Sequence, residues 1–222
     1  MAEGKKILLE RVSLRYGSYT AVNEVSLEVG AGEFLSLLGP SGCGKTTTLR
    51  MIAGFAVPSD GRIVVGGVDV THMPARRRGV GLVFQSYALW PHMTVFENIA
   101  FGLNLRRHSR PAIRAKVDEV LTLTNLSGLE ARYPRELSGG QQQRVAVARA
   151  LALDPPVLLM DEPLSNLDRK LRVDMRRELK QLQRRIGMTT LYVTHDQEEA
   201  LSMSDRVAVM DKGSVLRVAR PE

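Results

Sequence analysis

The sequence contains only one cysteine and no long apolar run, and each scarcity excludes a class of protein. With Cys43 alone among 222 residues, no internal disulfide can form, which indicates a reducing compartment. No apolar run approaches the roughly 18 residues that a membrane helix needs, and residues 1–6 lack the apolar core of a signal peptide. We therefore expect a soluble chain that meets any membrane only through partners.

The composition is that of an ordinary folded protein with an excess of positive charge. Hydrophobic residues make up 44% and charged residues 25%, so disorder is not expected, and 222 residues suffice for one large domain or two small ones. The sequence has no internal repeat and no low-complexity segment. A net charge of +7 favours anionic partners such as nucleotides, membrane head groups or nucleic acid, unless it is spread over a solvated surface.

Residues 39–47 fit the nucleotide-loop pattern G-x-x-x-x-G-K-[ST]. They lie between an apolar run, Phe34–Leu38, and a helix-like run that starts at Thr46, and this order predicts a phosphate cradle. Lys45 is expected to reach the β- and γ-phosphates and Thr46 to offer its hydroxyl to Mg²⁺. A plain turn would need glycines but neither the lysine nor the threonine. The residues expected to contact nucleotide are Gly39, Pro40, Ser41, Gly42, Cys43, Gly44, Lys45, Thr46 and Thr47.

Two carboxylates follow the apolar run Val157–Met160. Because α/β sheets bind ligands at the carboxyl ends of their strands, Asp161 is expected to hold Mg²⁺, and Glu162 to orient and deprotonate an attacking water. The alternative is an acidic pair that caps a helix before Pro163. The upstream phosphate loop favours the catalytic interpretation.

A second glycine-rich stretch, Leu137–Arg144, reads Leu-Ser-Gly-Gly-Gln-Gln-Gln-Arg. A serine and two glycines that open a helix expose backbone N–H groups beside a hydroxyl, which is a second anion site. One ATP does not need two such loops, so a lone phosphate-loop kinase or GTPase fits poorly. A protein that presents this loop to another subunit's nucleotide fits well, and a glycine-rich helix cap is the alternative. The residues concerned are Ser138, Gly139, Gly140 and Gln141.

The remaining chain predicts an α/β nucleotide core interrupted by helices. Short strands between residues 7 and 38, the first two at 7–9 and 12–14, indicate an antiparallel layer, and strand signals stop from about 86 to 153. We expect a helical insertion there, with a core formed by about 1–85 and 154–222. Further strands are expected at 62–65, 81–84, 157–160, 190–194 and 206–210, and helices from Ser109-Arg-Pro111, from about Ser138 and over 167–186.

Together these motifs identify a family. In order, Gly39–Thr47, Gln85, Leu137–Arg144, Val157–Glu162, Ser165–Asp168 and His195 resemble the nucleotide-binding subunit of an ATP-binding-cassette (ABC) transporter over essentially the whole chain. The resemblance implies a P-loop NTPase (RecA-like) core with an antiparallel β subdomain and an inserted helical subdomain. It also implies a head-to-tail dimer, or pairing with a homologous ATPase subunit. Two ATP molecules would lie between the phosphate loop of one subunit and Ser138–Gln141 of the other.

The resemblance also assigns roles to single residues. It implies that Gln85 contacts the metal and the attacking water, that His195 contacts the γ-phosphate and that Asp168 lies at the dimer interface. Tyr16 resembles the aromatic residue that stacks on adenine. Taken alone, His195 could be an ordinary histidine at a strand end and Tyr16 plain packing.

The stretch Phe84–Asn98 is similar to bacterial importer subunits that energise uptake of sugars, polyamines, ferric iron or phosphonates. Its apolar residues at 87, 89, 90 and 96 could form a groove for a helix of the membrane partner, or could be core. The resemblance implies an ATPase at the cytoplasmic face of the inner membrane, with permease subunits as partners and a solute-binding protein as an indirect one. Ser165-Asn-Leu-Asp168 leans slightly toward sugar-type importers.

Two further expectations concern charge and chain length. A soluble ABC ATPase acting on nucleic acid or ribosomes would suit the charge of +7, but such proteins carry two cassettes, zinc ligands or a long coiled coil, so no nucleic-acid partner is expected. Arg76–Arg78 and Arg106–Arg110 are interpreted as solvated loops, with lipid or nucleic-acid sites as the less favoured alternative. Importer subunits usually continue into a small β-rich regulatory domain, which would begin where this chain stops; either it has been removed or regulation through it is absent.

Overall fold

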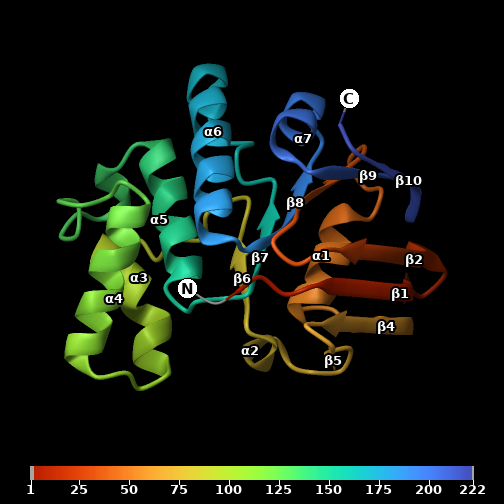
Figure 1. Ribbon diagram of the computed structural model, residues 1–222, viewed down its shortest axis with the longest axis horizontal. Helices are drawn as coiled ribbons and strands as arrows, with labels where there is room; N and C mark the ends of the chain where they lie inside the picture. Colours follow the sequence, from red (N-terminus) through yellow and green to blue (C-terminus); the bar gives the residue numbers. More distant parts are fainter. Residues whose placement is uncertain (1–2, 222) are drawn as a thin grey trace.

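The computed structural model describes residues 3–221, so residues 1–2 and 222 of the expected 1–222 domain lie outside the described residues. A six-stranded sheet forms the centre of the molecule (Figure 1). Its strands run in the order β10 (Ser214–Ala219), β9 (Arg206–Asp211), β3 (Phe34–Leu38), β8 (Thr189–Thr194), β7 (Val157–Asp161) and β6 (Val80–Val83). All are parallel except β10, which pairs antiparallel with β9.

The parallel arrangement collects the candidate site at one edge of the sheet. Neighbouring strands are in register, with Leu38 opposite Thr194 and Val83 opposite Met160. The segments that leave β3, β6, β7 and β8 therefore emerge together. They carry the phosphate loop, Gln85, Glu162 and His195.

A second sheet is antiparallel, as predicted, with the order β2 (Tyr19–Val29), β1 (Ile7–Tyr16), β4 (Asp60–Val65) and β5 (Val68–Asp69). The two short strands expected at 7–9 and 12–14 are parts of the single strand β1. Its pairing with β2 shifts register between Leu9 and Val12, and Arg11 in that interval has φ 46°. A bulge of this kind breaks the alternation of apolar and polar residues without ending the strand.

Helices cover both faces of the central sheet. Residues alternate along β3, so that Leu35 and Leu37 pack in a cluster with α1 (Lys45–Ala53) and the antiparallel sheet. Phe34 faces the opposite side and packs in a cluster with α6 (Arg169–Ile186) and the helical segment. A short helix, α7 (Gln197–Met203), contacts β3 and β8. Among residues 3–221, no helix combines the length and apolarity that crossing a membrane requires.

Between residues 86 and 153 the described elements are all helices, and they lie away from the antiparallel sheet (Figure 1). They are α3 (Val95–Leu105), α4 (Arg110–Leu123), a 3₁₀ turn (Pro134–Glu136) and α5 (Gly139–Leu151). The start of α4 is as predicted, with Ser109 as N-cap. Helix α3 was not predicted, although Thr94 and Glu97 form a capping box that marks its start.

The short helix α2 (Ala75–Arg78) corrects one prediction. Arg78 is buried, whereas the run Arg76–Arg78 was interpreted as a solvated loop. Its guanidinium donates to the carbonyls of Met51 and Ile52 in the last turn of α1, as well as to Thr71 and Met73. The carbonyl of Met51 also accepts from the N–H of Gly54 at 3.2 Å, and the guanidinium supplies a further donor to the end of α1, where carbonyls lack the partners of a continuing helix. Burial lowers the pKa of Arg78.

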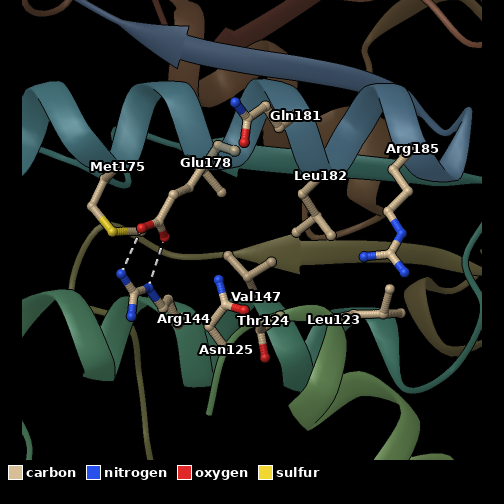
Figure 2. Close-up of a pocket in the computed structure, with 11 residues that line it drawn as sticks. Leu123, Thr124, Asn125, Arg144, Val147, Met175, Glu178, Gln181, Leu182 and Arg185 are labelled. Carbon is tan, nitrogen blue, oxygen red and sulfur yellow. Dashed lines mark hydrogen bonds and ion pairs between the residues drawn. The ribbon is translucent and has the colours of Figure 1, made fainter.

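The helical segment meets α6 along a seam drawn in Figure 2. Arg144 of α5 donates two hydrogen bonds to Glu178 of α6, at 2.8 and 2.7 Å. Beside this pair lies a hollow of about 190 Å³, lined by apolar side chains such as Leu179 and Leu182 and reached by Arg185. The second turn of α5 is thus held to α6 by a bidentate ion pair.

Candidate functional site

The loop from Gly39 to Gly44 joins β3 to α1, and its glycines serve different purposes. A Cβ on Gly39 would lie 2.2 Å from the carbonyl oxygen of Met210, and one on Gly44 would lie 2.7 Å from that of Ala21. Gly42 has φ +80° and faces open space. The three glycines of this loop are therefore not equivalent. Two of them are required by the chain's own packing.

Lys45 begins α1 and lies across this loop. Its Nζ donates to the carbonyls of Gly39 at 2.7 Å and Pro40 at 2.8 Å, and the residue is buried. Buried Cys43 lies beneath it, with its Sγ 3.8 Å from Nζ. Pro40, Ser41 and Gly42 are exposed and Thr47 is half-buried. A cation held by carbonyls, at the start of a helix, is poised to bind an anion.

The predicted metal ligands carry hard oxygen donors. Thr46 donates its hydroxyl to Oδ1 of Asp161 at 2.7 Å, which brings the first turn of α1 and the end of β7 together. Burial raises the pKa of Asp161, and the hydrogen bond from Thr46 offsets only part of this rise. Within residues 3–221, no three His, Cys, Asp or Glu side chains cluster to hold a metal. A hydroxyl, one carboxylate and the Gln85 amide oxygen fit Mg²⁺, which keeps several waters.

Gln85 lies two residues beyond β6 and is tied to the loop that follows Glu162. Its amide nitrogen donates to Oγ of Ser165 at 3.3 Å, and Ser165 in turn donates to the carbonyl of Glu162 at 2.9 Å. Asn166 donates to the Gln85 carbonyl at 2.8 Å. An alanine at 166 could not make this bond. No motif in the sequence indicated that Ser165 and Asn166 hold Gln85.

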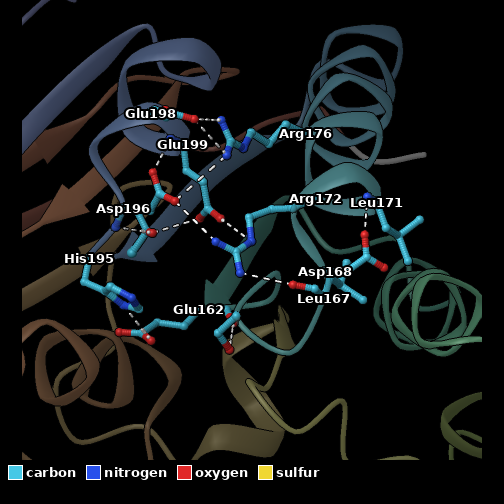
Figure 3. A network of polar contacts seen from close by, with 12 residues as sticks. Glu162, Leu167, Asp168, Leu171, Arg172, Arg176, His195, Asp196, Glu198 and Glu199 are labelled. Carbon is cyan, nitrogen blue, oxygen red and sulfur yellow. Dashed lines mark hydrogen bonds and ion pairs between the residues drawn. The ribbon is translucent and has the colours of Figure 1, made fainter.

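Glu162 and His195 lie together, a pairing that the sequence did not predict (Figure 3). His195 Nδ1 is 3.1 Å from Oε2 of Glu162. The backbone of Glu162 is fixed by its N–H bond to the carbonyl of Val193 at 3.0 Å and has φ 44°, an unfavourable conformation for glutamate. The surrounding fold thus keeps the backbone of Glu162 in a strained conformation that holds its carboxylate against the His195 imidazole. This arrangement is suited to proton transfer.

The second glycine-rich loop opens α5. Ser138 is the N-cap, and its hydroxyl accepts from the N–H of Gln141 at 3.3 Å while the Gln141 side chain accepts from Ser138 N–H at 2.9 Å. The capping box therefore uses two of the donors that were expected to be free. Gly139 and Gly140, in the first turn, have no intrahelical acceptor for their N–H groups.

Asp168 and Tyr16 complete the predicted residues. Asp168 is the exposed N-cap of α6 and accepts from the N–H of Leu171 at 2.9 Å. Tyr16 ends β1 on the antiparallel sheet with 59% of its surface exposed. Exposure leaves the ring available for stacking, and its role stays a prediction.

Comparison with known proteins shows which family the chain resembles. Residues 22–165 match the family model described as ABC transporter. The chain is 58% identical over 221 residues to the spermidine/putrescine import ATP-binding protein PotA of Rubrobacter xylanophilus, covering 99% of this chain and 59% of that protein. It is 54% identical over 215 residues to the Fe(3+) ions import ATP-binding protein FbpC of Agrobacterium fabrum, covering 97% and 61%. The chain therefore spans about three fifths of the length of these relatives.

Solved structures agree with the fold. A dimeric ATP-binding cassette in a post-hydrolysis state, bound to ADP and Pi, has a TM-score of 0.84 and 33% identity and covers 97% of this chain and 99% of its own. A nucleotide-free cassette from an ABC transporter has a TM-score of 0.87 and 28% identity, covering 98% and 92%. The α/β fold class predicted from the sequence, a P-loop NTPase core with an antiparallel β layer, is confirmed. The chain belongs to the ABC transporter family.

Proposed function

We propose that this chain is the ATP-hydrolysing subunit of a membrane ABC importer for a small polar solute, and that it works as a head-to-tail dimer with two ATP at the interface. One observation carries the proposal. The chain holds a complete phosphate loop and a second glycine-rich loop at the start of α5. The glycines of the second loop do not have the positive φ that would make glycine necessary for the fold. Because the fold of its own chain does not require these glycines, the second loop is suited to contact a nucleotide held by another subunit.

In the proposed site, residues 39–47 surround the phosphates of ATP, with Lys45 turned toward them, and Tyr16 stacks on adenine. Thr46, Asp161 and Gln85 hold Mg²⁺, which neutralises charge on the phosphate oxygens. Ser138, Gly139, Gly140 and Gln141 of the second subunit close over the same nucleotide. Asp168 lies at that interface, which its exposure at the start of α6 supports.

Glu162 is the proposed general base. Its carboxylate accepts a proton from the attacking water, and His195, 3.1 Å away, orients that carboxylate and contacts the γ-phosphate. Gln85 positions the water from the other side. Because Gln85 is hydrogen-bonded to Ser165 and Asn166, its place depends on the loop that follows Glu162.

A groove of about 410 Å³ supports docking of a permease helix. It lies between β6, α3 and α5, and its lining includes Phe84, Trp90 and Phe101. Of the apolar residues weighed as groove or core, Tyr87 is buried and Leu89 and Phe96 pack against the core, whereas Trp90 lines the groove. The exposed ring of Phe55 extends the apolar surface, 6.3 Å from Phe84.

This placement supports the division into a nucleotide core, about 1–85 and 154–222, and a helical subdomain, about 86–153, which carries the second loop and much of the groove. The protein would act at the cytoplasmic face of the inner membrane, with a solute-binding protein as an indirect partner. The relatives named above are import proteins for polyamines and for ferric ions, so the solute class stays open among these, sugars and phosphonates. Their names favour import over action on nucleic acid or ribosomes.

Glu162→Gln tests the proposal. Because a general base contributes about 10²- to 10⁴-fold in rate, we expect Mg²⁺-dependent ATP hydrolysis to fall by that factor while ATP binding is retained. Glu28→Gln, which alters an exposed carboxylate on β2, is the matched control and should hydrolyse ATP normally. Hydrolysis by Glu162→Gln at nearly the unaltered rate would contradict the assignment.

A further inference from the structure

Arg172, in the first turn of α6, contacts two loops that leave neighbouring strands (Figure 3). Its Nη2 donates to the carbonyl of Leu167 at 3.1 Å, just before Asp168. Its Nη1 lies 3.5 Å from Oδ2 of Asp196, which follows His195. Its Nε lies 3.8 Å from Oε1 of Glu199. One guanidinium thus spans from the loop of Asp168 to the loop of His195.

The His195 side of this link is rigid. Glu199 is buried, and its carboxylate accepts from the hydroxyls of Tyr192 and Thr194, both at 2.8 Å. Asp196 caps α7 by accepting from the N–H of Glu199 at 3.1 Å, and its own N–H donates to Thr194 at 3.0 Å. The backbone on both sides of His195 is therefore held by hydrogen bonds around one buried carboxylate. A buried carboxylate needs a compensating charge, which Arg172 supplies.

The Asp168 side of the link leads back to the candidate base. The carbonyl that Arg172 holds belongs to Leu167, whose N–H donates to Leu164 at 3.1 Å. The neighbouring Ser165 is bonded to the Glu162 carbonyl, so the loop is a short chain of contacts from Glu162 to Arg172.

We propose that Arg172 is a positioning residue: it keeps His195 aligned with Glu162 by fixing the loop of Asp168 to the loop of His195. Arginine suits this position because its planar fork donates in several directions at once, whereas an ammonium is a single point charge. The consequence for turnover rests on the proposed function, but the structural link does not. A partner that displaces the Asp168 loop would, through Arg172, displace His195 as well.

Arg176 provides a matched comparison, since it lies one turn later on α6 and also reaches α7. Its hydrogen bonds run to Glu198 at 3.3 and 3.4 Å, and its Nη2 lies 3.9 Å from Asp196. They do not extend to the carbonyl of Leu167, which Arg172 holds. Arg172→Lys and Arg176→Lys each keep the charge, so a difference between them isolates the link between loops.

Amide hydrogen exchange of the nucleotide-free chain tests the link without any catalysis. We expect Arg172→Lys to raise exchange about 10-fold or more in residues 162–168 and 193–197, and Arg176→Lys to change it less than about 2-fold. Exchange in α1 should stay unchanged in both variants. Equal effects of the two variants, or no effect of Arg172→Lys, would overturn the inference. Should Arg172→Lys not fold, Asp196→Asn, which can still cap α7, should raise exchange in residues 193–197.

Turnover tests the catalytic consequence. We expect Arg172→Lys to lower kcat about 10-fold with KM for ATP changed less than about 2-fold. In a His195→Ala background the same change should alter kcat less than about 2-fold, because the two effects share one route. An equal loss in both backgrounds would overturn the positioning role. If the unaltered chain hydrolyses no ATP, the proposed function fails, and hydrogen exchange alone decides the inference.

Discussion

The two glycine-rich loops look alike in the sequence but differ in what their glycines do. Gly39 and Gly44 lie against backbone carbonyls: a Cβ added to either would be 2.2 or 2.7 Å from a carbonyl oxygen, respectively. Gly44 also has φ +104°. Gly139 and Gly140 have no positive φ, and a Cβ there would meet only leucine side chains, at 3.2 and 3.1 Å. A side chain can move away where a backbone carbonyl cannot. The glycines of the first loop are therefore required by the packing of their own chain, while those of the second loop could be replaced without disturbing its backbone.

The arginines that support the two loops, Arg78 and Arg144, also differ in how firmly they are held. Arg78 is buried below the helix of the first loop and satisfies carbonyls of α1. Arg144 holds the helix of the second loop to α6 through Glu178, with 24% and 35% of these side chains exposed. A helix held by a half-exposed ion pair can shift more readily than one anchored by buried hydrogen bonds. This difference suits a loop that, in the proposed dimer, meets and leaves another subunit.

The largest expected effect is that of Gly39→Ala. Its Cβ would overlap the Met210 carbonyl, so either β9 or the loop must move. We expect unfolding free energy to fall by about 4 kcal/mol or more, measured by urea denaturation. A loss below about 1 kcal/mol would show that the first loop is not fixed as described.

Arg78→Met should have the next largest effect. The variant keeps most of the apolar volume but removes the guanidinium that donates to carbonyls at the end of α1 and in the segment before α2. We expect a loss of about 3 kcal/mol in unfolding free energy, measured in the same way. Arg77→Met, which alters an exposed neighbour, is the control and should change it by less than about 0.5 kcal/mol.

Arg144→Met should destabilise the chain less, because solvent already reaches the ion pair with Glu178. We expect a loss of about 1.5 kcal/mol, seen as a lower melting temperature. If Arg144→Met costs as much as Arg78→Met, the second loop is anchored as firmly as the first and the contrast fails.

Gly139→Ala should have the smallest effect on stability, within about 0.5 kcal/mol, because alanine favours the helix and Leu167 can yield. Its effect on ATP-dependent association should be large, since the added methyl group lies where the nucleotide of the second subunit is proposed. Sedimentation with ATP measures this association. Normal association would show that the glycine serves no partner.

Much of the fold was predictable because its signals are local. The sequence correctly predicted three local features: the β3–loop–α1 pattern, the apolar strand before Asp161 and the 3.6-residue period of α6. Arg78 and Arg172 did not stand out, because their partners are backbone carbonyls or residues distant along the chain. The pairing of Glu162 with His195 likewise depends on the order of β7 and β8 in the sheet, which motif spacing does not reveal.

The most direct measurement is the mass of the chain in solution by light scattering, with Mg²⁺ and ATP. Glu162→Gln, which should bind ATP without consuming it, is expected to double in mass when ATP is added. The double variant Glu162→Gln/Gly140→Asp is expected to bind ATP yet stay monomeric, because a carboxylate in the second loop repels the partner's nucleotide. Dimers formed by the double variant, or no dimers from Glu162→Gln alone, would contradict the two-loop interface.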